Sequence, residues 1–200
     1  MRTHSLKNEE NLKYVTDRVD VVNYFDYQIA EMFWVNSDNG NIKFYKVPGG
    51  KWKWILFDLD WGINTGEDNG YKRDGFLHVL NPAGTGYADS FENDLIRALL
   101  ENPEMEDLFL ERCAYYLKEV YTAEAINAEI DKYVEIMAPE MEKHYERWPD
   151  HGSVTSWERH VGRLRTFADE RTAYMVKHMQ DWFDLSDSRM EELLGDLFTE

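Results

Sequence analysis

The segments "FWVNSDNGNIKFYK" (residues 33–46) and "WKWILFDLDWG" (residues 52–62) decide the fold that we predict for this chain. Within them, "IKFYKV" and "WKWILF" are rich in aromatic and β-branched residues, and the turn formers "PGGK" separate these two runs. We therefore expect a β-hairpin over residues 42–57. Asp and Asn are disfavoured in strands, so the carboxylates and amides at the outer ends of both runs need another explanation.

Four polar side chains are expected to meet at the open end of this hairpin. Asp38 and Asn41 lie in the turn that enters the first strand, and Asp58 and Asp60 lie at the exit of the second. The start of one antiparallel strand lies beside the end of its partner, so these side chains should converge. Three close carboxylates repel each other unless a cation lies among them, and oxygen ligands suit magnesium, manganese or calcium. The alternative is that the turn residues bond only their own backbone.

A helix is predicted directly before the hairpin. Apolar residues recur there at helical spacing, Asp17 or Asp20 is available as the N-cap, and the turn formers after Asn36 should end the helix. The segment before Asp17 is polar and shows no pattern. Residues 59–88 are rich in glycine and without periodicity, which predicts one long irregular loop.

The rest of the chain is predicted to be helical. Pro139 is expected to kink one of these helices. The fold class expected is therefore α+β and mainly helical: a hairpin packed on a helix, followed by four or five helices. The predicted N-caps are Asp89 or Ser90, Asn102 with Pro103 at the first helical position, Thr122, and the capping boxes "TSWE" (residues 155–158) and "SRME" (residues 188–191).

Composition narrows the classes of function. The 200 residues carry 22 Lys and Arg against 39 Asp and Glu, a net charge of −17, which disfavours nucleic acid as a partner. The apolar runs are too short for a membrane-spanning helix, and the first residues lack the pattern of a signal peptide. The single cysteine, Cys113, is expected to be a buried helix residue, and the six histidines lack the spacing of a metal site.

The two segments that decide the fold also carry a family resemblance. The phrases "YFDYQIAEMFWVNSDNGNIKFYK" and "GKWKWILFDLDWGIN" resemble the CotH kinase family, named for the spore coat protein H. Members typically show a helix, a phrase of the type N-x-D…N, a strand bearing Lys or Arg, and W-x-W-I-x-x-D-x-D followed by Gly. Both phrases occur here in order and at the spacing of a hairpin.

The resemblance implies an atypical protein kinase that uses ATP and Mg²⁺ or Mn²⁺ to phosphorylate Ser or Thr in protein substrates. Asp38 is then the candidate catalytic base, and Asn41 and Asp58 are candidate metal ligands. Asp60 is a second candidate ligand or a group that orients the ligands without touching the metal. It opens "DWG", which is similar to the magnesium-binding triplet of ordinary protein kinases, so the sequence leaves open whether Asp58 or Asp60 is the primary ligand.

The resemblance also sets expectations for the whole protein. The chain looks like a single domain over residues 1–200 that forms the C-terminal part of a CotH-like kinase, because the segment before the predicted helix is too short for the nucleotide lobe. We expect it to bind metal weakly and to be inactive alone. The substrate would be a protein of the spore coat or cell surface, and the location the spore coat or extracellular space. The alternative function is a non-catalytic binding or structural module that keeps the kinase-like fold.

Overall fold

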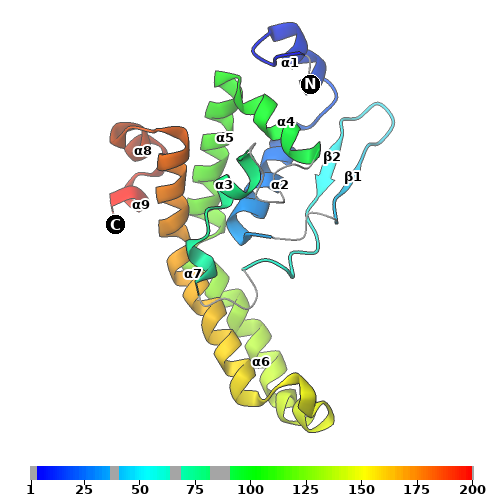
Figure 1. Cartoon of the computed structure of the whole chain (residues 1–200), viewed down its shortest axis with the longest axis vertical. Coiled ribbons are helices and arrows are strands. Elements are labelled where there is room, and N and C mark those ends of the chain that lie inside the picture. The colour runs from blue at the N-terminus through cyan, green and yellow to red at the C-terminus, as the bar shows by residue number, and fades with distance from the viewer. Residues whose placement is uncertain (1–3, 37–40, 64–68, 82–90, 200) are drawn as a thin grey trace.

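The computed structural model describes residues 4–36, 41–63, 69–81 and 91–199. Figure 1 shows a group of packed helices from which α6 and α7 project together, while the hairpin lies at an outer edge of the group. A π-helical turn (Tyr116–Val120) continues α5, and short 3₁₀ turns cover Gly70–Lys72 and Pro149–His151. The described elements are α1 (Glu9–Thr16), α2 (Val21–Trp34), β1 (Lys43–Tyr45), β2 (Lys53–Ile55), α3 (Gly75–Leu80), α4 (Phe91–Leu100), α5 (Pro103–Tyr115), α6 (Ala123–Arg147), α7 (Val154–Phe183), α8 (Asp187–Leu194) and α9 (Asp196–Thr199).

Helix α2 is the centre of the core. The carboxylate of Asp20 caps it by accepting a hydrogen bond from the backbone N–H of Asn23, and the helix ends at Val35 in the left-handed conformation. It packs against α3, α5 and β2. The helix predicted before the hairpin is therefore confirmed. Its fully buried side chains include Tyr24, Phe25, Ile29, Met32 and Phe33.

The predicted hairpin is also confirmed, with shorter strands than the sequence suggested. β1 and β2 pair antiparallel in the register Lys43↔Ile55, Phe44↔Trp54, Tyr45↔Lys53. The rings of Phe44 and Trp54 are neighbours on the face that packs on α2, where Trp54 contacts Tyr24 with 4.4 Å between ring centroids. The expected packing of this aromatic face against the preceding helix is thus what holds the hairpin in place.

The outer edge of β2 is covered by the chain around the start of α2. The side-chain amide of Asn23 donates to the carbonyl of Trp54 (3.2 Å), and its oxygen accepts the N–H of Trp54 (2.6 Å). Next to it, the backbone of residues 18–20 exchanges two hydrogen bonds with Trp52. Asn23 therefore takes the place of a third strand, since it satisfies both backbone groups of one residue of β2.

Replacing Asn23 with alanine should destabilise the protein by about 1–3 kcal/mol, because the backbone N–H and C=O of Trp54 would lose their partners in a partly buried setting. Urea denaturation measures this change. The matched control is Asn127→Ala, which removes an exposed bond to Asp169 and a long 3.5 Å bond from Arg165, and should cost less than about 0.5 kcal/mol. Equal losses in the two variants would contradict the bridging role of Asn23.

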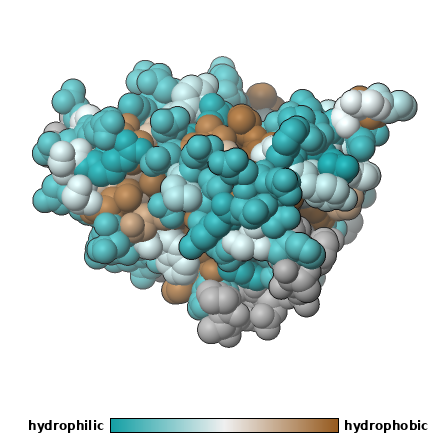
Figure 2. Space-filling model, turned by 90° about the horizontal axis from the view of Figure 1, so that it is seen from above, coloured by the Kyte–Doolittle hydropathy of each residue, from teal (hydrophilic) through white to brown (hydrophobic). Residues whose placement is uncertain are grey.

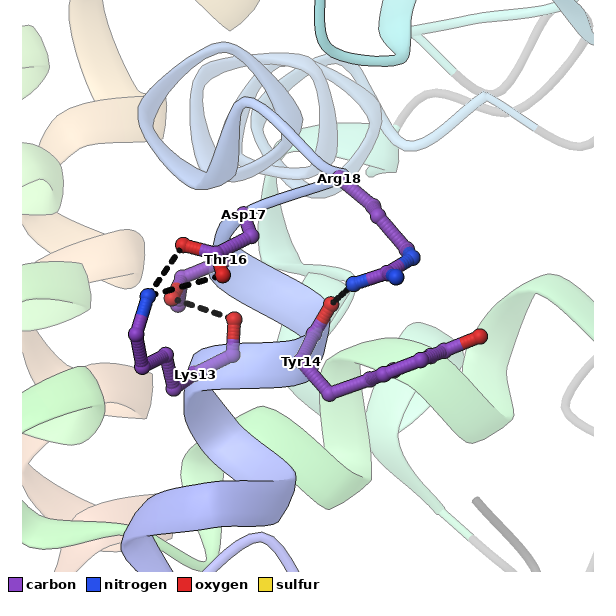
Figure 3. Close-up of polar contacts among 5 residues, drawn as sticks. All are labelled: Lys13, Tyr14, Thr16, Asp17 and Arg18. Carbon is purple, nitrogen blue, oxygen red and sulfur yellow. Dashed lines mark hydrogen bonds and ion pairs between the residues drawn. The ribbon is translucent and has the colours of Figure 1, made fainter.

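Helix α1 corrects the expectation that the first residues are unpatterned. Figure 3 shows how its end is held: Lys13 forms an ion pair with Asp17 at 2.8 Å, and the Arg18 guanidinium donates to the carbonyl of Tyr14 at 2.9 Å. The guanidinium also lies over the Tyr14 ring. Within α1 only Val15 is buried. With one buried residue in two turns, apolar positions do not repeat at helical spacing, so this helix could not be predicted from the sequence pattern.

The long irregular loop expected over residues 59–88 is wrong over residues 70–80. There the 3₁₀ turn Gly70–Lys72 leads into α3, whose N-cap Asp74 accepts a hydrogen bond from the N–H of Leu77 at 2.9 Å. Six residues are too few to reveal helical periodicity in a sequence. The apolar side chains of α3 nevertheless enter the core: Phe76, Val79 and Leu80 are buried.

Two of the predicted helix starts are confirmed. Asn102 caps α5, with Pro103 at the first helical position, and Thr122 caps α6. The helix α6 continues across Pro139 as one element. Residues 89 and 90, the caps expected before α4, lie outside the described residues.

Two predicted capping boxes are wrong by two residues. Helix α7 is capped by Ser153, whose hydroxyl accepts the N–H of Ser156, while the Ser156 hydroxyl accepts the N–H of Ser153. A serine at the third helical position thus does what glutamate does in the usual capping box. Helix α8 likewise begins after Ser186 rather than Ser188.

The surface agrees with the acidic, polar composition. Figure 2 shows hydrophilic residues over most of one face, with hydrophobic residues reaching the surface in separate patches. Among the described helices, none is long and apolar enough to cross a membrane. Cys113 is buried as expected, and burial raises the pKa of its thiol well above the usual value.

Candidate functional site

The open end of the hairpin brings two of the predicted site residues together. Asn41, two residues before β1, donates a hydrogen bond from Nδ2 to Oδ2 of Asp58 at 2.8 Å, although 17 positions separate them. Both residues are exposed, so a ligand can reach them. Asp58 has a φ of 59°, a left-handed conformation that is uncommon for a residue other than glycine. The backbone thus bends sharply at the residue whose carboxylate faces Asn41.

The other two candidates are placed differently. Asp60 is exposed in a turn that the N–H of Gly62 closes on the carbonyl of Leu59 at 2.9 Å. Asp38 lies outside the described residues, so its convergence on this edge stays a prediction. Within the described part of the chain, no three His, Cys, Asp or Glu residues are grouped as metal ligands.

The turn after Asp60 is attached to the end of α2. The N–H of Ile63 donates to the carbonyl of Trp34 at 2.6 Å. A Cβ on Gly62 would lie 2.8 Å from the carbonyl oxygen of Leu59 and 3.0 Å from that of Trp34, which is closer than side chains tolerate. The close approach that glycine permits here connects the last turn of α2 to the segment carrying Asp58 and Asp60.

A buried arginine holds the same end of α2 from the opposite side. Arg171 of α7 is fully buried, and its guanidinium donates to the carbonyls of Met32 (2.8 Å), Phe33 (2.8 Å), Tyr71 (2.8 Å) and Arg73 (2.6 Å). Burial lowers its pKa to about 9, so the side chain remains a cation at neutral pH. A cation at the C-terminus of a helix is stabilised by the helix dipole.

Sequence reasoning missed Arg171. Its four acceptors are backbone carbonyls from two segments that lie 98 to 139 positions away, and no side-chain type marks such acceptors in a sequence. The two segments are also in direct contact, because a Cβ on Gly75 would lie only 2.1 Å from the carbonyl oxygen of Met32. Arg171 therefore joins the end of α2 to the chain that enters α3.

A histidine lies beside the residue that enters the predicted catalytic turn. Nε2 of His78 is 3.1 Å from the backbone oxygen of Asn36, and Asn36 is itself buried. Burial lowers the pKa of His78, although the hydrogen bond to Asn36 opposes this change. The neutral imidazole with a proton on Nε2 suits this contact. His78 therefore packs next to the predicted catalytic turn.

We expect the free energy of unfolding to fall as the pH drops below about 6.5. The folded-state pKa of His78 is depressed, so in this range the unfolded chain binds more protons than the folded chain, and stability is lost as the pH falls. Urea denaturation across this range should show a weaker pH dependence in His78→Gln than in the wild type. An unchanged slope in His78→Gln would refute the assignment.

Comparison with known proteins gives one match. The family model described as CotH kinase protein matches residues 2–175, a span that contains the hairpin, Asn41, Asp58 and Asp60. No curated protein and no solved structure matches the chain. The match covers most of the sequence and bears out the resemblance of the two segments around the hairpin. The chain belongs to the CotH kinase family.

Proposed function

We propose that the natural protein containing this chain transfers the γ-phosphoryl group of ATP to Ser or Thr hydroxyls of a protein substrate. The observation that carries the proposal is the contact of Asn41 with Asp58 at the open end of the hairpin, in a chain of the CotH kinase family. Phosphoryl transfer is catalysed mainly by positioning and by neutralising charge, and it needs a metal held by oxygen ligands next to the phosphates.

The donor set fits Mg²⁺ or Mn²⁺. Asn41, Asp58 and Asp60 offer hard oxygen ligands on exposed side chains, and magnesium is commonly held by one or two carboxylates plus substrate phosphates. The amide nitrogen of Asn41 faces Asp58. Its amide oxygen would supply the ligand, and the bond from the amide nitrogen holds this side chain next to the Asp58 carboxylate. When bound, the metal would neutralise charge on the phosphates.

The proposed base is Asp38, three residues before Asn41. Its carboxylate would accept the proton of the substrate hydroxyl while the hydroxyl oxygen forms a bond to the γ-phosphorus. The bond from that phosphorus to the bridging oxygen breaks, and its electron pair leaves with ADP. Asn36, buried and in contact with His78, supports the chain that enters this turn.

The proposal extends to the rest of the protein in two ways. The helices around α2 would correspond to the C-terminal lobe of a kinase-like fold, with the nucleotide bound between this lobe and a further one. The substrate would be a spore-coat or cell-surface protein, for which the support is the family alone.

The test is transfer of radiolabelled phosphate from γ-labelled ATP by the natural full-length protein in the presence of Mg²⁺ or Mn²⁺. Mass spectrometry of the labelled protein should place the phosphate on Ser or Thr. A folded protein that binds a divalent metal but labels neither itself nor any coat or surface protein offered to it would contradict the proposal. That outcome would favour a non-catalytic binding module.

A further inference from the structure

The side chain of Lys43 in β1 extends toward the end of the hairpin where Asn41 and Asp58 meet. The register places its Cα opposite Ile55, yet its Nζ lies 4.1 Å from the ring centroid of Phe57, two residues further along the partner strand. Phe57 directly precedes Asp58. The lysine side chain therefore extends along the hairpin to the end where the candidate metal ligands meet.

The charge of Lys43 contributes little to holding the hairpin together. Within the described residues it forms no ion pair, whereas Lys53 on the partner strand binds Asp20 at 3.1 Å. Its contact with Phe57 is a cation–π interaction on an exposed surface, which contributes only about 0.5–1 kcal/mol. Its ammonium group therefore lies next to the candidate site, and no carboxylate among the described residues forms an ion pair with it, although the chain carries a net charge of −17.

The charges at this end of the hairpin indicate what Lys43 binds. A divalent cation held by Asn41 and Asp58 would by itself repel the nearby ammonium group. Lys43 stabilises a complex here only if the ligand brings more negative charge than the metal neutralises. The phosphate chain of a nucleoside triphosphate does so, and ammonium groups bind phosphate oxygens as point charges.

We infer that Lys43 binds a phosphate oxygen of the metal–nucleotide complex at the open end of the hairpin. The inference rests on the proposed phosphotransferase function and names a residue that holds the phosphates. Lys46 supplies a matched control: it lies just after β1, carries the same charge, and is placed over Trp52 instead.

Labelling with pyridoxal phosphate tests the site directly in the natural full-length protein. Its aldehyde condenses with a lysine amine, releasing water, and borohydride reduces the imine; its phosphate selects amines near a phosphate site. Peptide mapping should show that Lys43 reacts faster with pyridoxal phosphate than with pyridoxal, and that ATP with Mg²⁺ protects it. Lys46 should show neither preference nor protection.

Calorimetry gives a second measure. Lys43→Met should weaken the binding of ADP with Mn²⁺ by about tenfold, the loss expected for one hydrogen bond to a charged group. Lys46→Met, with the same change in net charge, should bind as the wild type does. Adenosine should bind equally well to all three proteins, because it carries no phosphate.

The outcomes separate this inference from the proposed function. Equal labelling of Lys43 by the two aldehydes, or unchanged ADP affinity in Lys43→Met, overturns the inference even if phosphoryl transfer is observed. A protein in which Lys43 responds to nucleotide as expected but which transfers no phosphate contradicts the proposed reaction and leaves the phosphate site standing. A wild-type protein that binds no nucleotide contradicts both.

Discussion

Replacing Asp58 with asparagine is expected to lower phosphoryl transfer by the natural full-length protein by about a thousandfold, because a catalytic metal contributes several kcal/mol of charge stabilisation. The substitution keeps the size of the side chain and an oxygen that can accept the hydrogen bond from Asn41. It removes the negative charge that would hold the metal. The hairpin should therefore stay folded while the metal-dependent reaction is lost.

The measurement combines labelled phosphate transfer with Mn²⁺ binding followed by electron paramagnetic resonance. Asp58→Asn should lose both. Comparison with Asp60→Asn identifies the primary ligand, because the variant with the greater loss of Mn²⁺ affinity is the one that lacks this carboxylate. The exposed Asp181 of α7 is the control, and Asp181→Asn should behave as the wild type. Full transfer activity in Asp58→Asn would refute the assignment.

The role proposed for Asp38 has a different signature. A general base contributes about a hundredfold to ten-thousandfold to a reaction, so Asp38→Ala should slow transfer by that amount. Its proposed partner is the attacking hydroxyl, so nucleotide and Mn²⁺ should bind with unchanged affinity. Loss of binding together with activity would assign Asp38 to the metal instead.

The part of the site that could be predicted is the part that hairpin geometry determines. The "PGGK" turn and the two apolar runs set the strand register, and the register brings Asn41 and Asp58 together from distant positions. Helix α2 was predictable for a similar reason, because its buried face recurs over fourteen residues. Both depend on patterns that extend along the sequence.

The features that were missed have no such pattern. Helix α3 is six residues long, and α1 buries a single side chain, so neither repeats often enough to show a period. The capping boxes of α7 and α8 were placed two residues late because each helix start offers two candidate hydroxyl caps, Ser153 and Thr155 for α7 and Ser186 and Ser188 for α8. Arg171 lies among polar residues on α7, and its partners are carbonyls that every residue possesses.

The second large effect is expected at Arg171. Replacing it with methionine should destabilise the protein by about 3–5 kcal/mol, the loss typical of removing one partner of a buried charged network. Methionine fills much of the space but donates no hydrogen bond. The carbonyls of Met32, Phe33, Tyr71 and Arg73 would then lose a donor in the core, and each such loss costs about 1–3 kcal/mol.

Urea denaturation of Arg171→Met against Arg165→Met measures this effect. Arg165 lies on the same helix and forms an ion pair with Asp131, but that pair is exposed and should contribute less than about 1 kcal/mol. Arg171→Lys should not restore stability, because one ammonium group has three donors on a single atom and cannot reach four carbonyls from two segments. Stability of Arg171→Met within 1 kcal/mol of that of Arg165→Met would show that the carbonyls find other donors. The large loss is expected because the carbonyls belong to the last turn of α2 and to the chain entering α3, and Arg171 bonds to both segments.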